Sequence, residues 1–296
     1  MRQIFSLCST MLLQEQELPV NTLNSIEKET VTVSDPVTKT ELIRALQKVG
    51  VTKHQIVEVH SSLSAFSYVI GGARTVVDAL METVGEEGTI LMPFQSSGNT
   101  EPSDWCNPAI APELYGEIRA SIPSYNPLTS DIHGMGAIVE NFVHRPGVQF
   151  SGHPNVSYAA WGRYARLLCN RQSTHFPLAE ESPTARLYEL KGKVLLLGTD
   201  FSKVTCMHLA EYRCDARPIQ ICGACVEGEN GPEWKKYLDL EIDSDDFVKI
   251  RPVMARKNMI RETMLSGCHI QFFSANDAVD IATRYFEKSG IYDLYR

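Results

Sequence analysis

The stretch at residues 194–213, VLLLGTDFSKVTCMHLAEYR, decides the fold. Its first part is a short apolar run that Gly198 closes, which is typical of a strand buried on both faces. Polar residues follow at once and predict a loop at the strand's carboxyl end, the edge of an open α/β sheet where ligands usually bind. The sequence therefore predicts a buried strand that leads directly into a functional loop.

His208 follows this loop, and Glu211 comes three residues later. If a helix begins here, the two side chains share one face, so the carboxylate can fix the imidazole tautomer and raise its basicity. Such a pair is suited to act as a general base and its orienting partner. A His and a Glu one turn apart are more often a solvated surface pair. The buried strand before them and the apolar neighbours Leu209 and Ala210 favour a segment that packs against the sheet.

Composition limits the class of protein. The chain has 296 residues, enough for one large domain or two small ones, with 43% hydrophobic and 22% charged residues, as in ordinary globular proteins. The formal net charge of −8 argues against nucleic acid as a partner and mildly favours a cationic one. No apolar run approaches the length that spans a membrane.

Eight cysteines are scattered through the chain, and only Cys222 and Cys225 form a Cys-x-x-Cys pair. No second pair and no histidine cluster at zinc-ligand spacing accompanies them, so we expect no metal site. Irregular cysteine spacing in a chain of this length indicates reduced thiols and a cytoplasmic location. Residues 1–36 are polar and mixed and predict an N-terminal tail, followed by a single domain at 37–296.

A turn and a helix start form the candidate cofactor site. The predicted strand at 56–59 runs into hydroxyl side chains, and glycines then open a predicted helix at 76–84. Backbone amides and a helix amino terminus suit an anion, and glycines allow close approach. We interpret this region as the site of a phosphorylated cofactor, although a plain strand-to-helix connection has the same composition. The candidate residues are His60, Ser61, Ser62, Leu63, Ser64, Gly71, Gly72, Ala73, Arg74 and Thr75.

Three further positions could contact a substrate. The predicted strand at 88–93 ends in a polar loop whose acids Glu101 and Asp104 are candidates for a cationic ligand, unless they simply face water. His153 is a second candidate histidine. It ranks below His208 because a His before Pro is more often a turn residue.

The last third of the chain predicts an antiparallel hairpin at 219–226 and 234–242, with a turn at 229–232. Along its second strand Asp239, Glu241 and Asp243 alternate with apolar residues, which predicts three carboxylates on one face. That face is either solvated or a binding surface for ammonium groups. Further short strands at 247–273 and a closing helix at 275–286 complete an α/β fold, in which helices flank a central mixed sheet.

The order of the motifs over about residues 38–288 resembles the aminoglycoside 3-N-acetyltransferase family. The motifs are His60-Ser61-Ser62-Leu63-Ser64, Gly71-Gly72-Ala73, Gly134-Met135-Gly136, His153-Pro154, Ser157-Tyr158-Ala159-Ala160-Trp161-Gly162, Glu181-Ser182-Pro183, Leu195-Leu196-Leu197-Gly198 and His208-Leu209-Ala210-Glu211. The resemblance implies an acyltransferase of antibiotic resistance that moves the acetyl group of acetyl-coenzyme A directly to an amine of an aminoglycoside or a related cationic amino sugar.

The resemblance also implies residue roles. His208 is the expected base with Glu211 as its partner, and the turn at 60–64 with the helix start at 71–75 holds the coenzyme's diphosphate and pantetheine. Carboxylates matching Glu101, Asp239 and Glu241 gather the substrate's ammonium groups. The chemistry agrees, because a protonated amine is no nucleophile until a base removes its proton. Thr205, Ser62 or a backbone amide could stabilise the thioester oxygen, and the sequence leaves this choice open.

One departure from the family pattern bears on the substrate. Ser202-Lys203-Val204-Thr205 stands where an Asp-Ser-Asn-Thr pattern is usual, before the expected base. A lysine repels a polycation, so Lys203 either points away from the site or argues against a standard aminoglycoside. Two alternatives therefore stay open: an N-acetyltransferase of a biosynthetic amino sugar, and a coenzyme A binding protein without catalysis.

Overall fold

The computed structural model describes residues 33, 35–96, 98–105, 108–132, 134–215 and 217–289. The predicted tail at 1–36 lies outside these residues except for its last positions, so it stays a prediction. Residues from Val33 onward cluster as one unit by their contacts.

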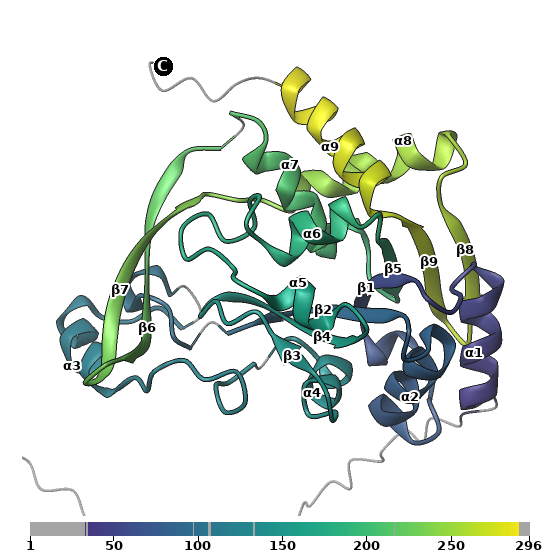
Figure 1. Ribbon diagram of the computed structural model, residues 1–296, viewed down its shortest axis with the longest axis horizontal. Helices are drawn as coiled ribbons and strands as arrows, with labels where there is room; N and C mark the ends of the chain where they lie inside the picture. Colours follow the sequence, from purple (N-terminus) through teal and green to yellow (C-terminus); the bar gives the residue numbers. More distant parts are fainter. Residues whose placement is uncertain are drawn as a thin grey trace, which may run out of the picture. The chain divides into compact units, whose positions relative to one another are not determined.

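The core element is a seven-stranded sheet with the order β3-β4-β2-β1-β5-β9-β8 (Figure 1). Strand β1 pairs in parallel with β2 and β5, and the outer pairs are antiparallel, which confirms the predicted mixed sheet. The strands are β1 (Ile56–Ser61), β2 (Thr89–Gln95), β3 (Gln149–Phe150), β4 (Val156–Gly162), β5 (Lys193–Leu197), β8 (Arg261–Leu265) and β9 (Cys268–Ser274).

Both faces of this sheet are buried, and β5 shows why its sequence is a continuous apolar run. Leu195 and Leu197 belong to one hydrophobic core, while Val194 and Leu196 belong to a second core on the other face. All four side chains are fully buried. Because burying one such side chain stabilises a fold by about 2 kcal/mol, this strand anchors both layers.

Helices cover each face (Figure 1). Helices α1, α2 and α4 contribute to the first core, and α5 to α9 contribute to the second. Their bounds are α1 (Lys39–Lys48), α2 (Gly72–Val84), α4 (Ala137–Val143), α5 (Ala165–Cys169), α6 (Pro183–Glu189), α7 (His208–Tyr212), α8 (Ile250–Arg256) and α9 (Ala275–Ser289), and a further short helix, α3, spans Tyr115–Ser121.

Local sequence signals fix several helix starts. Thr38 caps α1 in a capping box with Glu41, and Ser182 caps α6 by accepting from the backbone N–H of Ala185. Helix α2 begins at Gly72, earlier than the predicted residue 76. Gly71, with φ of 79°, supplies the left-handed turn before it, a conformation that favours glycine.

The prediction of short strands alone at 247–273 is wrong for its first part. Residues Asp245–Lys249 form a 3₁₀ turn, and α8 follows. Ile250 and Met254 are both fully buried, and their spacing of four residues is helical rather than extended. Pro252 lies in the first turn of α8, where its missing N–H costs no intrahelical hydrogen bond.

The hairpin forms a separate two-stranded sheet of β6 (Ile219–Gly228) and β7 (Gly231–Leu240). On one face two apolar side chains lie opposite each other and are exposed, Ile221 by 69% and Leu238 by 39%. Asp239 is buried on the inner face. The predicted row of three carboxylates on one strand face is wrong, because β7 ends at Leu240, before Glu241 and Asp243.

The other edge of the hairpin is held by the loop that follows β2. Thr100 forms a bridge with Ala224, and the backbone N–H of Glu101 donates to the carbonyl of Gly223 at 3.1 Å. This contact places the loop that carries Glu101 beside the strand β6, next to the strand that carries Asp239.

Candidate active site

The helix α7 begins with His208, and its ring is hydrogen-bonded to Glu211. The distance from Nδ1 to Oε2 is 2.5 Å. Glu211 is fully buried. Because an ionised carboxylate can only accept, Nδ1 carries the hydrogen and Nε2 is left as the basic nitrogen.

The second carboxylate oxygen of Glu211 is also engaged. Oε1 accepts from Nε of Arg217 at 2.6 Å and from the backbone N–H of Asp243 at 3.1 Å. A buried carboxylate needs such compensation to stay ionised. Arg217 is not among the predicted site residues, because no regular spacing in the sequence relates the segment before β6 to α7.

His208 has both an aromatic and an acidic neighbour. Its ring packs on Phe247 with the ring centroids 4.8 Å apart, and only 9% of the residue is exposed. Asp239 lies close enough for the charge of His208 to act on its carboxyl, whose pKa burial raises. Asp239 accepts from the Tyr212 hydroxyl at 2.5 Å and from its neighbour's backbone N–H, both through Oδ1. Its Oδ2 is the oxygen that a ligand could reach.

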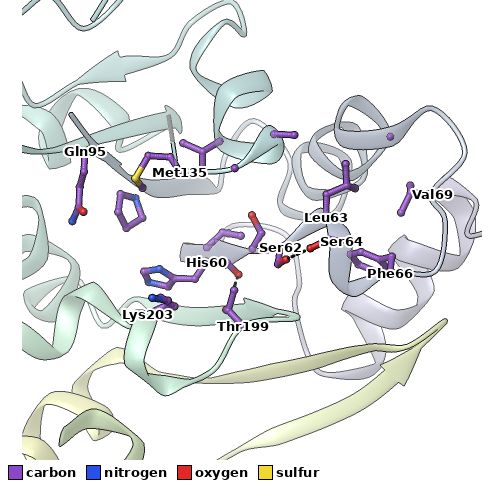
Figure 2. Close-up of a pocket in the computed structure, with 18 of the residues that line it drawn as sticks. His60, Ser62, Leu63, Ser64, Phe66, Val69, Gln95, Met135, Thr199 and Lys203 are labelled. Atoms are coloured by element: carbon purple, nitrogen blue, oxygen red, sulfur yellow. Dashed lines mark hydrogen bonds between the residues drawn. The ribbon is translucent and has the colours of Figure 1, made fainter. Parts of the chain in front are cut away.

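A cavity of about 860 Å³ opens beside this pair, at the carboxyl ends of β1 and β5 (Figure 2). Its wall includes six of the predicted cofactor residues: His60, Ser61, Ser62, Leu63, Ser64 and Gly72. The wall does not include Gly71, Ala73, Arg74 and Thr75. The motif Gly134-Met135-Gly136 and the following Ala137 also form part of the wall.

The cavity wall suits a long ligand with several polar groups. The hydroxyls of Ser62 and Ser64 lie 3.0 Å apart, and the hydroxyl of Ser61 is buried with no hydrogen-bond partner among the described residues. A buried hydroxyl of this kind needs a partner, which a ligand can provide. Gly136 has a φ of 87° and leaves space in the cavity because it has no side chain. A Cβ atom added at this position would lie 4.0 Å from its nearest neighbour, the Ser61 carbonyl oxygen.

One end of the cavity adjoins the histidine pair. Thr205 lies in the wall and begins the 3₁₀ turn Thr205–Met207 that leads into His208. His208 itself is not part of the wall. Lys203, an exposed cation, and Thr199 share this end with His60 (Figure 2). Lys203 forms no ion pair with any residue that the structure describes.

A second histidine–carboxylate pair joins His60, in the cavity wall, to a buried acid behind it. Glu58 on β1 is fully buried, and its Oε2 lies 3.2 Å from Nε2 of His60. Oε1 accepts from the Tyr158 hydroxyl at 3.1 Å. Burial raises the pKa of Glu58, but the charge of His60 and hydrogen bonds from neighbouring side chains outweigh this and leave it lowered. The sequence analysis missed Glu58, although a charged residue inside an apolar strand is a signal.

The predicted substrate-binding acids differ in their surroundings. Arg119 engages Glu101, with Nε lying 3.0 Å from Oε1 and 3.2 Å from Oε2. Asp104 and Glu241 are exposed, and Glu241 lies just beyond β7. Among these acids and Asp239, only Asp239 is buried, close to His208.

His153 is held by its own turn. Its Nε2 lies 3.2 Å from the carbonyl of Thr174, and Nδ1 accepts from the backbone N–H groups of Asn155 and Val156. Burial lowers the pKa of His153 to about 4, so its ring is neutral. With both nitrogens engaged, the ring supports the turn rather than offering a group to a ligand.

Comparisons with known proteins agree with the resemblance. A family model described as aminoglycoside 3-N-acetyltransferase matches residues 59–287. A Bacillus subtilis protein, the SPbeta prophage-derived aminoglycoside N(3')-acetyltransferase-like protein YokD, is 39% identical over 252 residues, which cover 85% of this chain and 93% of that protein. The crystal structure of YokD superposes with a TM-score of 0.82.

Two other relatives extend the comparison. Aminoglycoside N(3)-acetyltransferase VIII of Streptomyces fradiae is 31% identical, with 88% of this chain and 96% of that protein covered. The structure of AAC-VIa bound to sisomicin is 27% identical, with 86% and 98% of the two chains covered and a TM-score of 0.76.

The described residues hold no group of three or more His, Cys, Asp or Glu side chains that could bind a metal ion. None of the helices in the described part of the chain is both long and apolar enough to cross a membrane.

Proposed function

The chain belongs to the aminoglycoside 3-N-acetyltransferase family, and we propose that His208, oriented by Glu211, is the base of its acetyl transfer reaction. The chain is an N-acetyltransferase that uses acetyl-coenzyme A. The observation that carries the proposal for the site is the buried pair of His208 and Glu211, which directly follows a cavity-lining turn.

The cavity holds the coenzyme in this proposal. Acetyl-coenzyme A supplies an acetyl group that is already activated as a thioester. The wall residues Ser61, Ser62 and Ser64 supply hydroxyls for the coenzyme's amides, and Gly72 and Gly136 leave room for its chain. Thr205 lies in the wall three residues before His208, and its hydroxyl, which donates to the Lys203 carbonyl at 3.4 Å, can turn to donate to the acetyl oxygen. Positioning is a large part of the rate, because the donor needs no further activation.

His208 prepares the acceptor. An amine is mostly protonated at neutral pH, so Nε2 takes a proton while Nδ1 donates to Glu211. The imidazolium that forms is stabilised by the ionised, buried Glu211. Neither His208 nor Glu211 has to move for this step, because Glu211 is already fixed from its second oxygen.

The acceptor binds between α7 and the hairpin. Asp239 lies near His208 and can bind one ammonium group. Glu101, Asp104 and Glu241 are the proposed contacts for the other ammonium groups of the acceptor. Sisomicin, the ligand of the related AAC-VIa structure, represents the class of acceptor that we propose. A cytoplasmic location is part of the proposal, because the six described cysteines are all free thiols.

A biosynthetic amino sugar is the second candidate acceptor. Lys203 favours it, because an exposed ammonium group at the cavity end repels a polycation more than a single amine. A thiol-release assay with acetyl-coenzyme A tests both candidates on one panel of aminoglycosides and nucleotide-linked amino sugars. Turnover of aminoglycosides supports the first candidate, and turnover of the nucleotide-linked amino sugars alone overturns it in favour of the second.

A further inference from the structure

The buried carboxylate of Glu211 joins three parts of the chain. Its Oε2 binds Nδ1 of His208 at 2.5 Å. Its Oε1 receives Nε of Arg217 at 2.6 Å and the backbone N–H of Asp243 at 3.1 Å. Since Glu211 is fully buried, these contacts replace the water that would otherwise stabilise its charge.

Arg217 is itself held from several sides. Its Nη2 donates to the Asp243 carbonyl at 3.2 Å and to Oδ2 of Asp246 at 3.3 Å. Its guanidinium carbon lies 5.6 Å from the ring centroid of Phe286 in α9. Because the planar guanidinium is fixed by these contacts, it directs its Nε–H at Glu211. The flexible side chain of a lysine could not do this.

The contacts of Arg217 also connect the hairpin to Glu211. Arg217 lies two residues before β6, and Asp243 lies three residues after β7, so both ends of the hairpin meet at Glu211. Tyr212 adds a third link by donating to Asp239 inside the hairpin. The short helix α7, which carries His208, is therefore fastened to the hairpin at three points.

We propose that Arg217 is a positioning residue, which holds Glu211 ionised and oriented toward His208 and ties the acceptor-binding hairpin to the base. The inference rests on the proposed role of His208 and Glu211. A deviation of about 1 Å in the base relative to the acceptor can cost on the order of 10²-fold in rate, so the effect of Arg217 falls on kcat. Coenzyme binding does not depend on it, because Arg217 is not part of the cavity wall.

The variant Arg217→Met tests this, with Arg213→Met as the matched control. Arg213 is a neighbouring arginine whose partner is the exposed Glu180, at 2.7 Å, and it makes no ion pair with Glu211. We expect Arg217→Met to lower kcat by about 10²-fold, to leave the dissociation constant of coenzyme A unchanged in a calorimetric titration, and to shift the downfield proton resonance of the His208–Glu211 hydrogen bond. Arg213→Met should leave all three unchanged.

Arg217→Lys keeps the positive charge but lacks the planar guanidinium, so it should recover part of the lost kcat. If Arg217→Met does not fold, Arg217→Lys serves as the test variant. Wild-type kcat in Arg217→Met, or an equal loss in Arg213→Met, overturns the inference. So does an Arg217→Lys variant with wild-type kcat and an unchanged proton resonance. If His208→Ala keeps full activity, the proposed function fails instead, and the two failures are thus distinguished.

Discussion

Arg119 forms an ion pair with Glu101, and its Nε lies within 3.2 Å of both carboxylate oxygens. The carboxylate is only 20% exposed, so the acid that the sequence offers to a cationic substrate is already partly neutralised by the protein. In the proposed acceptor site, this ion pair reduces the negative charge that Glu101 offers to a cation.

Removing this arginine should strengthen the binding of a polycation. In Arg119→Met the carboxylate of Glu101 loses its partner, so we expect KM for an aminoglycoside to fall several-fold, to about a third or less. Steady-state kinetics at low salt measure this change. The double variant Arg119→Met with Glu101→Gln should return KM to the wild-type value or above, and a KM that stays low in the double variant would contradict the role of Glu101.

Loss of the base should separate catalysis from coenzyme binding. His208→Ala removes the nitrogen that takes the amine proton, and we expect kcat to fall by about 10²–10⁴-fold. Because His208 is not part of the cavity wall, calorimetry should give an unchanged dissociation constant for coenzyme A. Unchanged turnover in this variant would remove His208 from the mechanism.

The charge of Lys203 should act on acceptor choice. Lys203→Ser removes an exposed ammonium group from the cavity end, so KM for a polycationic aminoglycoside should fall, and by more at low ionic strength, where screening is weak. KM for a monoamine sugar should change less. A salt-independent effect, or an equal effect on both acceptors, would show that the lysine does not act through its charge.

The cavity wall at Gly136 should be sensitive to a single methyl group. Gly136→Ala and Gly152→Ala place a side chain at similar positive φ values, 87° and 84°, but only Gly136 lines the cavity. Backbone strain should therefore lower the melting temperature of both variants to a similar degree. Only Gly136→Ala should raise KM for acetyl-coenzyme A. Equal KM values in the two variants would mean that the coenzyme does not bind against this turn.

His153 should make stability depend on pH. Burial lowers the pKa of its ring to about 4, whereas the unfolded chain binds a proton near the ordinary value of 6.5. The unfolded state therefore gains protons first, and stability should fall as pH drops from about 6.5 to 4, with a limit of about 3 kcal/mol from this group. Denaturant titrations of wild type and His153→Gln should show a shallower decline in the variant. Parallel curves would contradict this assignment.

The elements that the sequence predicted well are those whose signals are local. The buried strand β5 and the spacing of His208 and Glu211 depend on neighbouring residues, and the structure has both. The partners Arg217 and Arg119 lie across loops from the acids they bind, so only the tertiary fold brings them together.

The hairpin shows that a sequence pattern can predict a strand without predicting which of its faces is buried. Alternation along residues 238–242 predicts a strand with two unlike faces, but a period of two does not state which face is covered. Leu238 is 39% exposed, whereas the acid Asp239 is buried and accepts from the Tyr212 hydroxyl. Hydrophobicity alone would bury Leu238 and expose Asp239, which is the reverse of what the structure has at these two positions.

The junction of the hairpin with Glu211 has an evolutionary implication. Strands β6 and β7 form a sheet separate from the seven-stranded one, so with the proposed role of the hairpin in binding the acceptor, mutations along them should alter the preferred amine without disturbing the main core. Of the two residues at the base of the hairpin, Arg217 is constrained because its guanidinium donates to the Glu211 carboxylate, whereas Asp243 donates through its backbone N–H, which any residue except proline supplies. A chimera that carries a foreign hairpin should therefore keep Arg217 and a residue other than proline at position 243, so that a new substrate preference does not disturb the carboxylate that orients His208.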